Sequence, residues 1–293
     1  MQELISLPKE INYIAAFLTL SCNYKCSYCI NHPENECLPR PTLAANAWVK
    51  YLNRLTLPVD LPITFQGGEP TQYPGFYDLI AGLNKNLRVD LLTNLSFDVE
   101  QFVKCIPPSR FYRSAPYAPI RVTYHPGQVK IDELLEKLIY LKEQKYPIGL
   151  YSIRIPGTEK LIENLKIKTT QLGIDYRTKE FLGTWRGKIL GDYHYDGGLF
   201  SKNLKKCICR TSEFLIGPDG SVYRCHRDLY RMENPIGNIL EGEYQPHYMY
   251  RPCDKFGDCN PCDLKRKTNR FQQDGHASVE IQFKTSQTQN LSP

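Results

Sequence analysis

Three cysteines near the start of the chain have a spacing that suits a metal centre. Cys22, Cys26 and Cys29 follow the pattern C-x3-C-x2-C, which places three thiolates on one short loop. Iron–sulfur clusters are held by cysteine thiolates, and a 4Fe-4S cluster normally takes four of them. Three local ligands would leave one iron open to a substrate or cofactor. The alternative is a zinc site whose fourth ligand is His32 or Cys37.

A second group of cysteines lies near the other end of the chain. It holds six of the eleven cysteines: Cys207, Cys209, Cys225, Cys253, Cys259 and Cys262. The total is odd and the N-terminus lacks the features of a secretory signal, so we expect metal or redox chemistry in place of disulfides. A structural zinc ribbon is the alternative. Cys37 and Cys105 fit no motif and are interpreted as packing residues.

The first cysteine motif and a glycine motif downstream resemble the signature of the radical S-adenosylmethionine (radical SAM) enzymes. Tyr28 places an aromatic residue before the last cysteine, and Gly67-Gly68-Glu69-Pro70 follows about forty residues later, like the GGE(P) motif of that family. The resemblance implies a 4Fe-4S cluster on the three cysteines, with the fourth iron chelating the amino and carboxylate groups of S-adenosylmethionine. It also implies cleavage of that cofactor to a 5′-deoxyadenosyl radical, which abstracts a hydrogen from the substrate.

The same resemblance assigns cofactor-binding residues, although no catalytic side chain. Gly67 and Gly68 are expected to let the backbone approach the methionine moiety closely. Glu69 is interpreted as a nearby charge, a loop brace or a helix-start carboxylate, and Tyr28 as an aromatic near the adenine or a packing residue over the cluster. Polar residues at the ends of later strands are expected to meet the cofactor's ribose or carboxylate: Asn94, Thr123, His125 and Arg154. For Arg154, an exposed salt bridge is the alternative.

The second cysteine group resembles the SPASM/Twitch extension of radical SAM enzymes, which holds auxiliary clusters. A cysteine pair is followed by Gly220-x4-Cys225 and then by a C-x2-C sequence. The resemblance implies one auxiliary 4Fe-4S cluster, with the preferred ligands Cys207, Cys225, Cys259 and Cys262. Cys209 competes with Cys207, and Cys253 is a spare or a substitute.

The elements that must position these residues alternate between strand and helix. Apolar patterning predicts strands at 14–20, 62–65, 88–93, 120–124, 148–155 and 174–182, and helices at 43–55, 76–83, 99–103, 131–141 and 158–173. Six such units predict an α/β fold with a parallel sheet, whose ligands lie at the carboxyl ends of the strands. The resemblance makes this a partial (β/α)6 barrel of radical SAM type, with a small β-hairpin-plus-helix extension that binds a cluster.

The domain organisation follows from the same patterning. We expect a core over 1–184, a glycine-rich connector over 185–206, an auxiliary cluster domain over 207–270 and a tail over 271–293. Pro218-Asp219-Gly220 between two apolar runs predicts a β-hairpin over 213–225. The basic residues after the last cysteine are interpreted as a solvated helix face, with docking of an acidic substrate or electron donor as the alternative: Lys265, Arg266, Lys267 and Arg270.

Composition excludes several classes of protein. The chain has 293 residues, 41% of them hydrophobic, and a net charge of +6, which suits a folded core and excludes a mainly disordered chain. No apolar run approaches the roughly 18–20 residues that span a bilayer, so we expect a cytoplasmic protein without a membrane partner. The basic surplus is not interleaved with aromatic residues, so nucleic acid is not an expected partner.

The predicted activity is that of a radical SAM oxidoreductase or modifying enzyme. The expected substrate is a small molecule of carbohydrate or aminocyclitol type, with a peptide or protein as the alternative and RNA third. A flavodoxin- or ferredoxin-type protein is the expected electron donor. A non-enzymatic zinc-binding module is the alternative from a different functional class.

Overall fold

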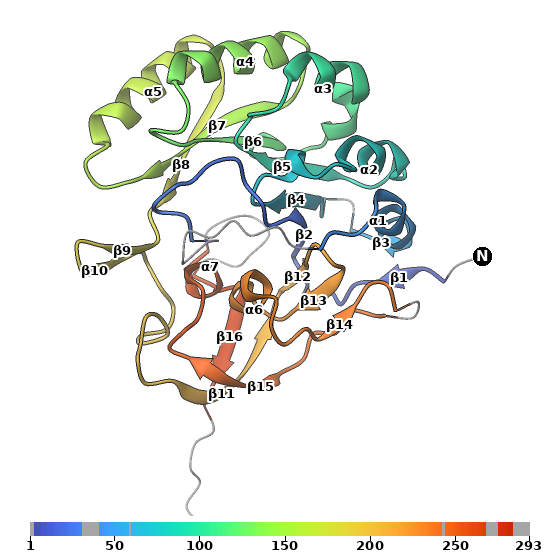
Figure 1. The fold of residues 1–293 in the computed structure, drawn as a ribbon, viewed down its shortest axis with the longest axis vertical. Coiled ribbons are helices and arrows are strands. Elements are labelled where there is room, and N and C mark those ends of the chain that lie inside the picture. The colour runs from blue at the N-terminus through green and yellow to red at the C-terminus, as the bar shows by residue number, and fades with distance from the viewer. Residues whose placement is uncertain (1–2, 31–40, 59, 242–243, 268–274, 284–293) are drawn as a thin grey trace, which may run out of the picture.

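The computed structural model describes residues 3–30, 41–58, 60–241, 244–267 and 275–283. A layer of helices covers one face of a large sheet, and a smaller β-rich extension formed by the C-terminal part of the chain lies on the other side of the sheet (Figure 1). His32, Cys37 and Arg270 lie outside the described residues.

Nine strands form the large sheet, in the order β14-β13-β12-β2-β4-β5-β6-β7-β8. Six of these strands are the predicted core: β2 (Tyr13–Thr19), β4 (Ile63–Gly67), β5 (Val89–Thr93), β6 (Ile120–Tyr124), β7 (Ile148–Arg154) and β8 (Asp175–Glu180). All five pairings among them are parallel. This confirms the predicted α/β class and the open, partial barrel, and no closed barrel is formed by the strands that the structure describes.

Helices connect successive core strands, as the alternation predicts. They are α1 (Ala45–Leu52), α2 (Phe76–Gly82), α3 (Val99–Cys105), α4 (Ile131–Glu143) and α5 (Glu159–Gln171), with short 3-10 turns η1 (Pro70–Gln72) and η2 (Pro108–Phe111). Leu134, Leu138 and Leu141 of α4 recur at helical spacing and are buried in the core between helices and sheet. Thr158 stands at the N-cap position of α5, but its hydroxyl donates to the Ile155 carbonyl and accepts no hydrogen bond from the N–H groups of the helix.

Two small pairs of strands flank the sheet. β1 (Ile5–Ser6) pairs in parallel with β3 (Leu55–Thr56). Within and just before the predicted connector, β9 (Gly183–Trp185) and β10 (Lys188–Leu190) form an antiparallel hairpin.

The predicted hairpin of the extension is continuous with the core sheet. It consists of β12 (Glu213–Ile216) and β13 (Ser221–Tyr223), followed by β14 (Gly237–Asn238). β12 pairs in parallel with β2, so that Phe214 lies opposite Ile14. The extension therefore continues the core sheet at its β2 edge.

The remaining extension elements form a separate three-stranded sheet with two short helices. The sheet order is β15 (Arg251–Phe256), β11 (Lys205–Thr211) and β16 (Val279–Gln282), and the helices are α6 (His226–Arg231) and α7 (Pro261–Leu264). Val279 and Ile281 of β16 are buried against this sheet's own core. The expected tail over 271–293 thus contains a structural strand, and its segments 271–274 and 284–293 lie outside the described residues.

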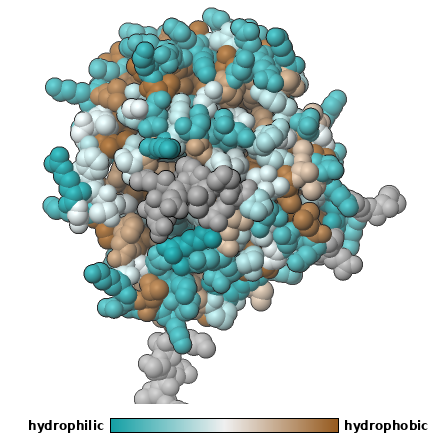
Figure 2. All heavy atoms as spheres, in the orientation of Figure 1, coloured by the Kyte–Doolittle hydropathy of each residue, from teal (hydrophilic) through white to brown (hydrophobic). Residues whose placement is uncertain are grey.

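The outer face of the helical layer carries many hydrophilic side chains in the view of Figure 2. Among the described residues, no helix is long and apolar enough to cross a membrane.

Candidate active site

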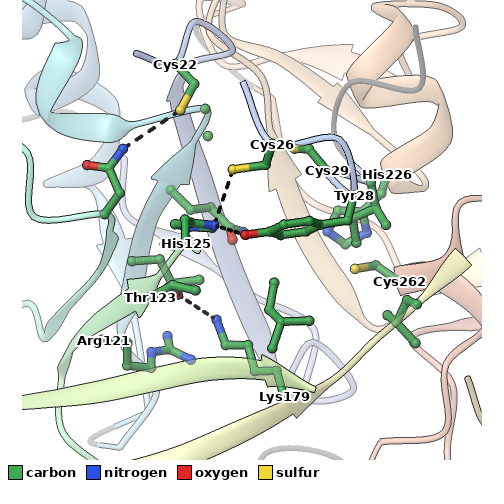
Figure 3. A pocket seen from close by; sticks show the side chains of 18 of the residues that line it. Cys22, Cys26, Tyr28, Cys29, Arg121, Thr123, His125, Lys179, His226 and Cys262 are labelled. Carbon is green, nitrogen blue, oxygen red and sulfur yellow. Dashed lines mark hydrogen bonds between the residues drawn. The ribbon is translucent and has the colours of Figure 1, made fainter. Parts of the chain in front are cut away.

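One cavity of about 420 Å³ gathers most of the predicted site residues. The cysteine loop, the core strands and the two extension helices all contribute to its wall (Figure 3). The predicted residues that line it are Cys22, Cys26, Tyr28, Cys29, Gly67, Gly68, Glu69, Asn94, Thr123 and His125. The strand-end polar residues are therefore placed next to the cysteine loop, as expected for the carboxyl ends of parallel strands.

Strand β6 presents alternate residues to this cavity at successive depths. Arg121, Thr123 and His125 lie two residues apart, so they share one face of the strand. His125 is at the level of the cysteine loop, where its Nδ1 lies 3.4 Å from the Cys26 Sγ and 3.1 Å from the Tyr28 Oη. The His125 and Tyr28 rings are stacked, with centroids 6.1 Å apart. Burial lowers the pKa of His125 to about 4, which keeps the imidazole neutral near pH 7.

The two glycines of the GGE motif lie against the backbone at the end of β2, where a side chain would not fit. A Cβ added to Gly67 would overlap the Thr19 carbonyl oxygen, and one added to Gly68 would overlap the Ser21 carbonyl oxygen. The Gly68 N–H donates to the Thr19 oxygen at 2.9 Å, and the Glu69 N–H donates to the Ser21 oxygen at 2.9 Å. The absence of side chains thus lets β4 close against the end of β2, directly before the first cysteine. The expected contact of Gly67 and Gly68 with the methionine moiety stays a prediction.

Glu69 is a buried brace between two strand ends. Its Oε1 accepts from the Thr71 N–H at 3.2 Å, the Thr71 hydroxyl at 2.6 Å and the Thr93 hydroxyl at 2.8 Å. Its Oε2 accepts from the Asn94 N–H at 2.7 Å. Burial raises the pKa of Glu69 even though these donors favour the carboxylate. The loop-brace and helix-start interpretations of Glu69 both describe the structure.

Asn94, whose N–H donates to Glu69, also contacts the cysteine loop. Its Nδ2 donates to the Asn23 Oδ1 at 2.9 Å and lies 3.9 Å from the Cys22 Sγ. On the other side of the loop, the Lys25 N–H donates to the Gln128 Oε1 at 3.0 Å. The loop is therefore held by side chains that follow β5 and β6, and not only by its own turn.

The far end of the cavity is charged, which sequence reasoning missed. The Lys179 Nζ lies 3.4 Å from the Thr123 Oγ1, and burial, followed by the nearby charge of Arg121, lowers the pKa of Lys179 to about 8. Lys267 pairs with the buried Glu213 at 3.4 Å. Lys267 belongs to the basic run noted in the sequence, but no motif marks the other residues. Lys179 and Arg121 lie on strands whose period-two alternation points them inward.

The basic run after the last cysteine is not a solvated helix face in the part the structure describes. α7 ends at Leu264, and Lys265 and Lys267 line the cavity. Arg266 pairs with Asp192 at the surface at 3.1 Å.

Arg154 does not reach the cavity. It is the last residue of β7 and is exposed, whereas Ile153 on the opposite face lines the cavity wall. The pairing of Arg154 with a cofactor carboxylate has no support from this geometry. Cys105, expected to pack in the interior, is also exposed.

His226, the residue after Cys225, is buried and lines the cavity. Its Nδ1 lies 2.9 Å from the Asp263 Oδ1, and its ring packs edge-on against Phe17.

Five of the six C-terminal cysteines surround a separate small cavity of about 20 Å³: Cys207, Cys209, Cys225, Cys253 and Cys259. The thiols of Cys207 and Cys209 both hydrogen-bond to the Cys253 sulfur, which lowers the pKa of Cys253 and raises the pKa of the other two. Cys262, one of the expected ligands, instead lines the large cavity.

Both cysteine groups offer sulfur as the common donor, the ligand type that suits iron–sulfur clusters and zinc. Among the described residues, no set of three His, Cys, Asp or Glu side chains is already arranged around a single metal position. The donor chemistry fits an iron–sulfur cluster at each place, with Cys22, Cys26 and Cys29 as the set beside the large cavity.

Comparison with solved structures identifies the fold. No protein-family model and no curated protein sequence matches the chain. Streptococcus suis SuiB bound to S-adenosylmethionine matches with a TM-score of 0.55 and 14% identity, covering 81% of this chain and 64% of SuiB. The enzyme anSMEcpe with AdoMet and the Cp18Cys peptide matches with a TM-score of 0.54 and 16% identity, covering 80% of this chain and 77% of that one. The fold is that of the radical SAM enzymes. This chain spans about 64% of the length of SuiB, and identities this low establish the radical SAM fold alone.

Proposed function

We propose that this protein is a radical SAM enzyme that cleaves S-adenosylmethionine reductively and abstracts a hydrogen from its substrate. The observation that carries the proposal is the convergence of the three loop cysteines, the GGE motif and the strand-end residues on one cavity. When bound, a 4Fe-4S cluster supplies the electron that cleaves the cofactor.

The protein's own residues would hold and orient the reactants. Cys22, Cys26 and Cys29 would ligate the cluster and leave one iron for the cofactor. Tyr28 and the neutral His125 form a stacked wall beside Cys26, which restricts where the cofactor can lie. Thr123, one step deeper on β6, offers a hydroxyl toward the cofactor or substrate.

The substrate that we propose is a small polar molecule of carbohydrate or aminocyclitol type, oxidised or modified by the radical. The cavity of about 420 Å³ falls in the range of small-molecule pockets, and beside the space for the cofactor, Lys179, Arg121 and Glu213 offer charged and hydrogen-bonding groups at the far end. A peptide substrate is the second candidate, because SuiB has been solved with its precursor peptide SuiA and anSMEcpe with peptides.

The C-terminal cysteines would hold an auxiliary 4Fe-4S cluster, as in SPASM/Twitch extensions. Such a cluster can take an electron from a substrate radical or orient the substrate. A flavodoxin- or ferredoxin-type donor would supply the reducing electron, and thiol-held clusters suit a reducing cytoplasm.

Iron content and cofactor cleavage test the proposal together. Anaerobically reconstituted protein should be brown and bind about eight irons, the sum of two 4Fe-4S clusters. With dithionite and S-adenosylmethionine it should release 5′-deoxyadenosine. The Cys22/Cys26/Cys29→Ala triple variant should lose about half of the iron and all of the deoxyadenosine, whereas the exposed Cys105→Ala variant should match the native protein. A colourless protein that binds zinc and releases no deoxyadenosine would support the non-enzymatic zinc module.

A further inference from the structure

The two cysteines of the C-x2-C sequence at α7 open onto different cavities. Cys259 lines the small cavity with four other cysteines, whereas Cys262 lines the large cavity with Cys29 and Lys179. Figure 3 shows the Cys262 sulfur pointing into the same space as Lys179. A spacing of two residues, which suggests a shared metal, does not bring these two thiols together here.

The local structure of α7 explains the divergence. Asn260 lies between the two cysteines and caps the helix, its Oδ1 accepting from the Cys262 N–H at 2.9 Å. The Asn260 Nδ2 donates to the Ile30 carbonyl at 3.2 Å, directly after the first cysteine loop. Cys259 therefore precedes the helix, and Cys262 stands within its first turn.

A second anchor fixes the orientation of α7. The buried Asp263 accepts from the backbone N–H groups of His226 and Arg227 at 2.9 and 3.3 Å, and from the His226 ring. Because α7 is tied to α6 on one side and to the cysteine loop on the other, its backbone is held with Cys262 on the side of the large cavity.

The five remaining thiols converge from four elements. Cys207 and Cys209 lie two residues apart on β11 and so share one face of the strand, and Cys253 on β15 lies opposite Cys207. Cys225 stands at the N-cap position of α6, and Cys259 precedes α7. Four thiolates complete a cubane cluster, so this set contains one more than is needed.

A basic residue adjoins this set of five. Arg224 directly precedes Cys225, and its guanidinium donates to Asp228 at 3.0 Å and to the carbonyl of Pro252, the residue before Cys253. Four thiolates with a 4Fe-4S core carry net negative charge, which a neighbouring arginine stabilises.

We infer that the auxiliary iron–sulfur cluster draws its four thiolates from Cys207, Cys209, Cys225, Cys253 and Cys259, and that Cys262 is a free thiol facing the radical SAM cavity. This ligand set rests on the proposed function for its metal, and it differs from the set with Cys262 that the SPASM/Twitch resemblance implies. Cys262 thereby becomes a substrate-side residue of the large cavity.

A crossed pair of variants tests the ligand set through iron content. Both are made in the Cys22/Cys26/Cys29→Ala background of the full chain, so that only auxiliary iron is counted. Cys262→Ala should keep about four irons and the native visible and EPR spectra of one 4Fe-4S cluster. The Cys209→Ala/Cys253→Ala double variant should lose this iron. Only three of the five thiols would remain, and Cys207 would be the only one of them on β11 or β15. The reverse pattern, iron lost with Cys262→Ala and kept in the double variant, would overturn the inference.

Alkylation of the native holoprotein gives a second measurement that needs no variant to fold. Iodoacetamide under anaerobic conditions, followed by peptide mass mapping, should modify Cys262 and the exposed Cys105, and should spare Cys225 and Cys259. Chelation of the iron should then make Cys225 and Cys259 reactive. Protection of Cys262 that disappears together with that of Cys259 on chelation would show that Cys262 is a ligand. Failure of the proposed enzyme activity can be told apart from failure of this ligand set. In the first case no deoxyadenosine is released, but the iron contents of the auxiliary-cluster variants are as expected.

Discussion

Replacing Glu69 by glutamine removes one acceptor from the brace beneath the cysteine loop. The carboxylate accepts four hydrogen bonds, three at Oε1 and one at Oε2. If the oxygen of the new amide keeps the three donors, its NH₂ faces the Asn94 N–H, and a buried donor left unsatisfied costs about 1–3 kcal/mol. The other three bonds lose the strength that charge gives them. A neutral amide is less costly to bury than a carboxylate, which offsets part of this loss.

The net expectation for Glu69→Gln is a loss of about 2 kcal/mol of stability, or about 4–8 °C in melting temperature at roughly 2–4 °C per kcal/mol. Because Asn94 also holds Asn23 of the cysteine loop, the stabilisation that S-adenosylmethionine gives the reconstituted protein should shrink as well. Thermal denaturation with and without the cofactor measures both effects.

The matched control is Glu100→Gln, which makes the same change at an exposed position in the first turn of α3. It should melt within about 2 °C of the native protein, as expected for a surface substitution worth about 0.5 kcal/mol or less. If Glu69→Gln melts as the control does and keeps the native cofactor-induced shift, the brace does not organise this site.

Three further substitutions probe other parts of the structure, each by thermal denaturation. Gly68→Ala should destabilise the protein by about 3 kcal/mol or more, because its Cβ overlaps backbone, whereas Gly127→Ala, at φ +79° with no atom nearby, should cost only about 1–2 kcal/mol; equal losses would contradict the clash. Asp90→Asn should cost about 3–5 kcal/mol, since it leaves the nearly buried Arg113 side chain at 2.7 Å and the partly buried Arg121 side chain at 3.3 Å without their buried carboxylate; a loss below about 1 kcal/mol would refute this. The buried Lys179 has a pKa of about 8 in the folded protein against an ordinary 10.5, so between these pH values the unfolded chain holds more protons and the stability of the native protein should rise with pH. Lys179→Met should flatten this rise; a native melting temperature that falls over this range would contradict the prediction.

The core could be predicted from sequence because its elements carry local patterns. The strand ending at Gly67 and the helix over 131–141 are marked by apolar periodicity bounded by glycine, proline or charged residues, and the structure places them within a few residues. The convergence of Asn94 and His125 followed from a general property of parallel sheets. These inferences needed only neighbours in sequence or the shared direction of strands.

The features that sequence missed depend on long-range pairing or on direction. The pairing of β12 with β2 joins residues about 200 positions apart, and no local pattern marks it. Val279 and Ile281 of β16 are too short an alternation to separate from a polar tail. The spacing of Cys259 and Cys262 gives their distance along the chain but not the cavity that each one lines; Cys259 precedes the Asn260 cap and Cys262 follows it within α7.

The large sheet continues across the expected domain boundary near residue 207. β2 is flanked by β4 on one side and β12 on the other, so the strand that leads into the cysteine loop is paired with both the core and the extension. Phe17 of β2 packs with Leu215 and Tyr223 of the hairpin, and the Asn260–Ile30 hydrogen bond links α7 to the end of the loop. Without the extension, β2 would be an edge strand with exposed apolar side chains, a state that proteins avoid. The extension therefore helps to hold the first cysteine loop in place as well as carrying its own thiols.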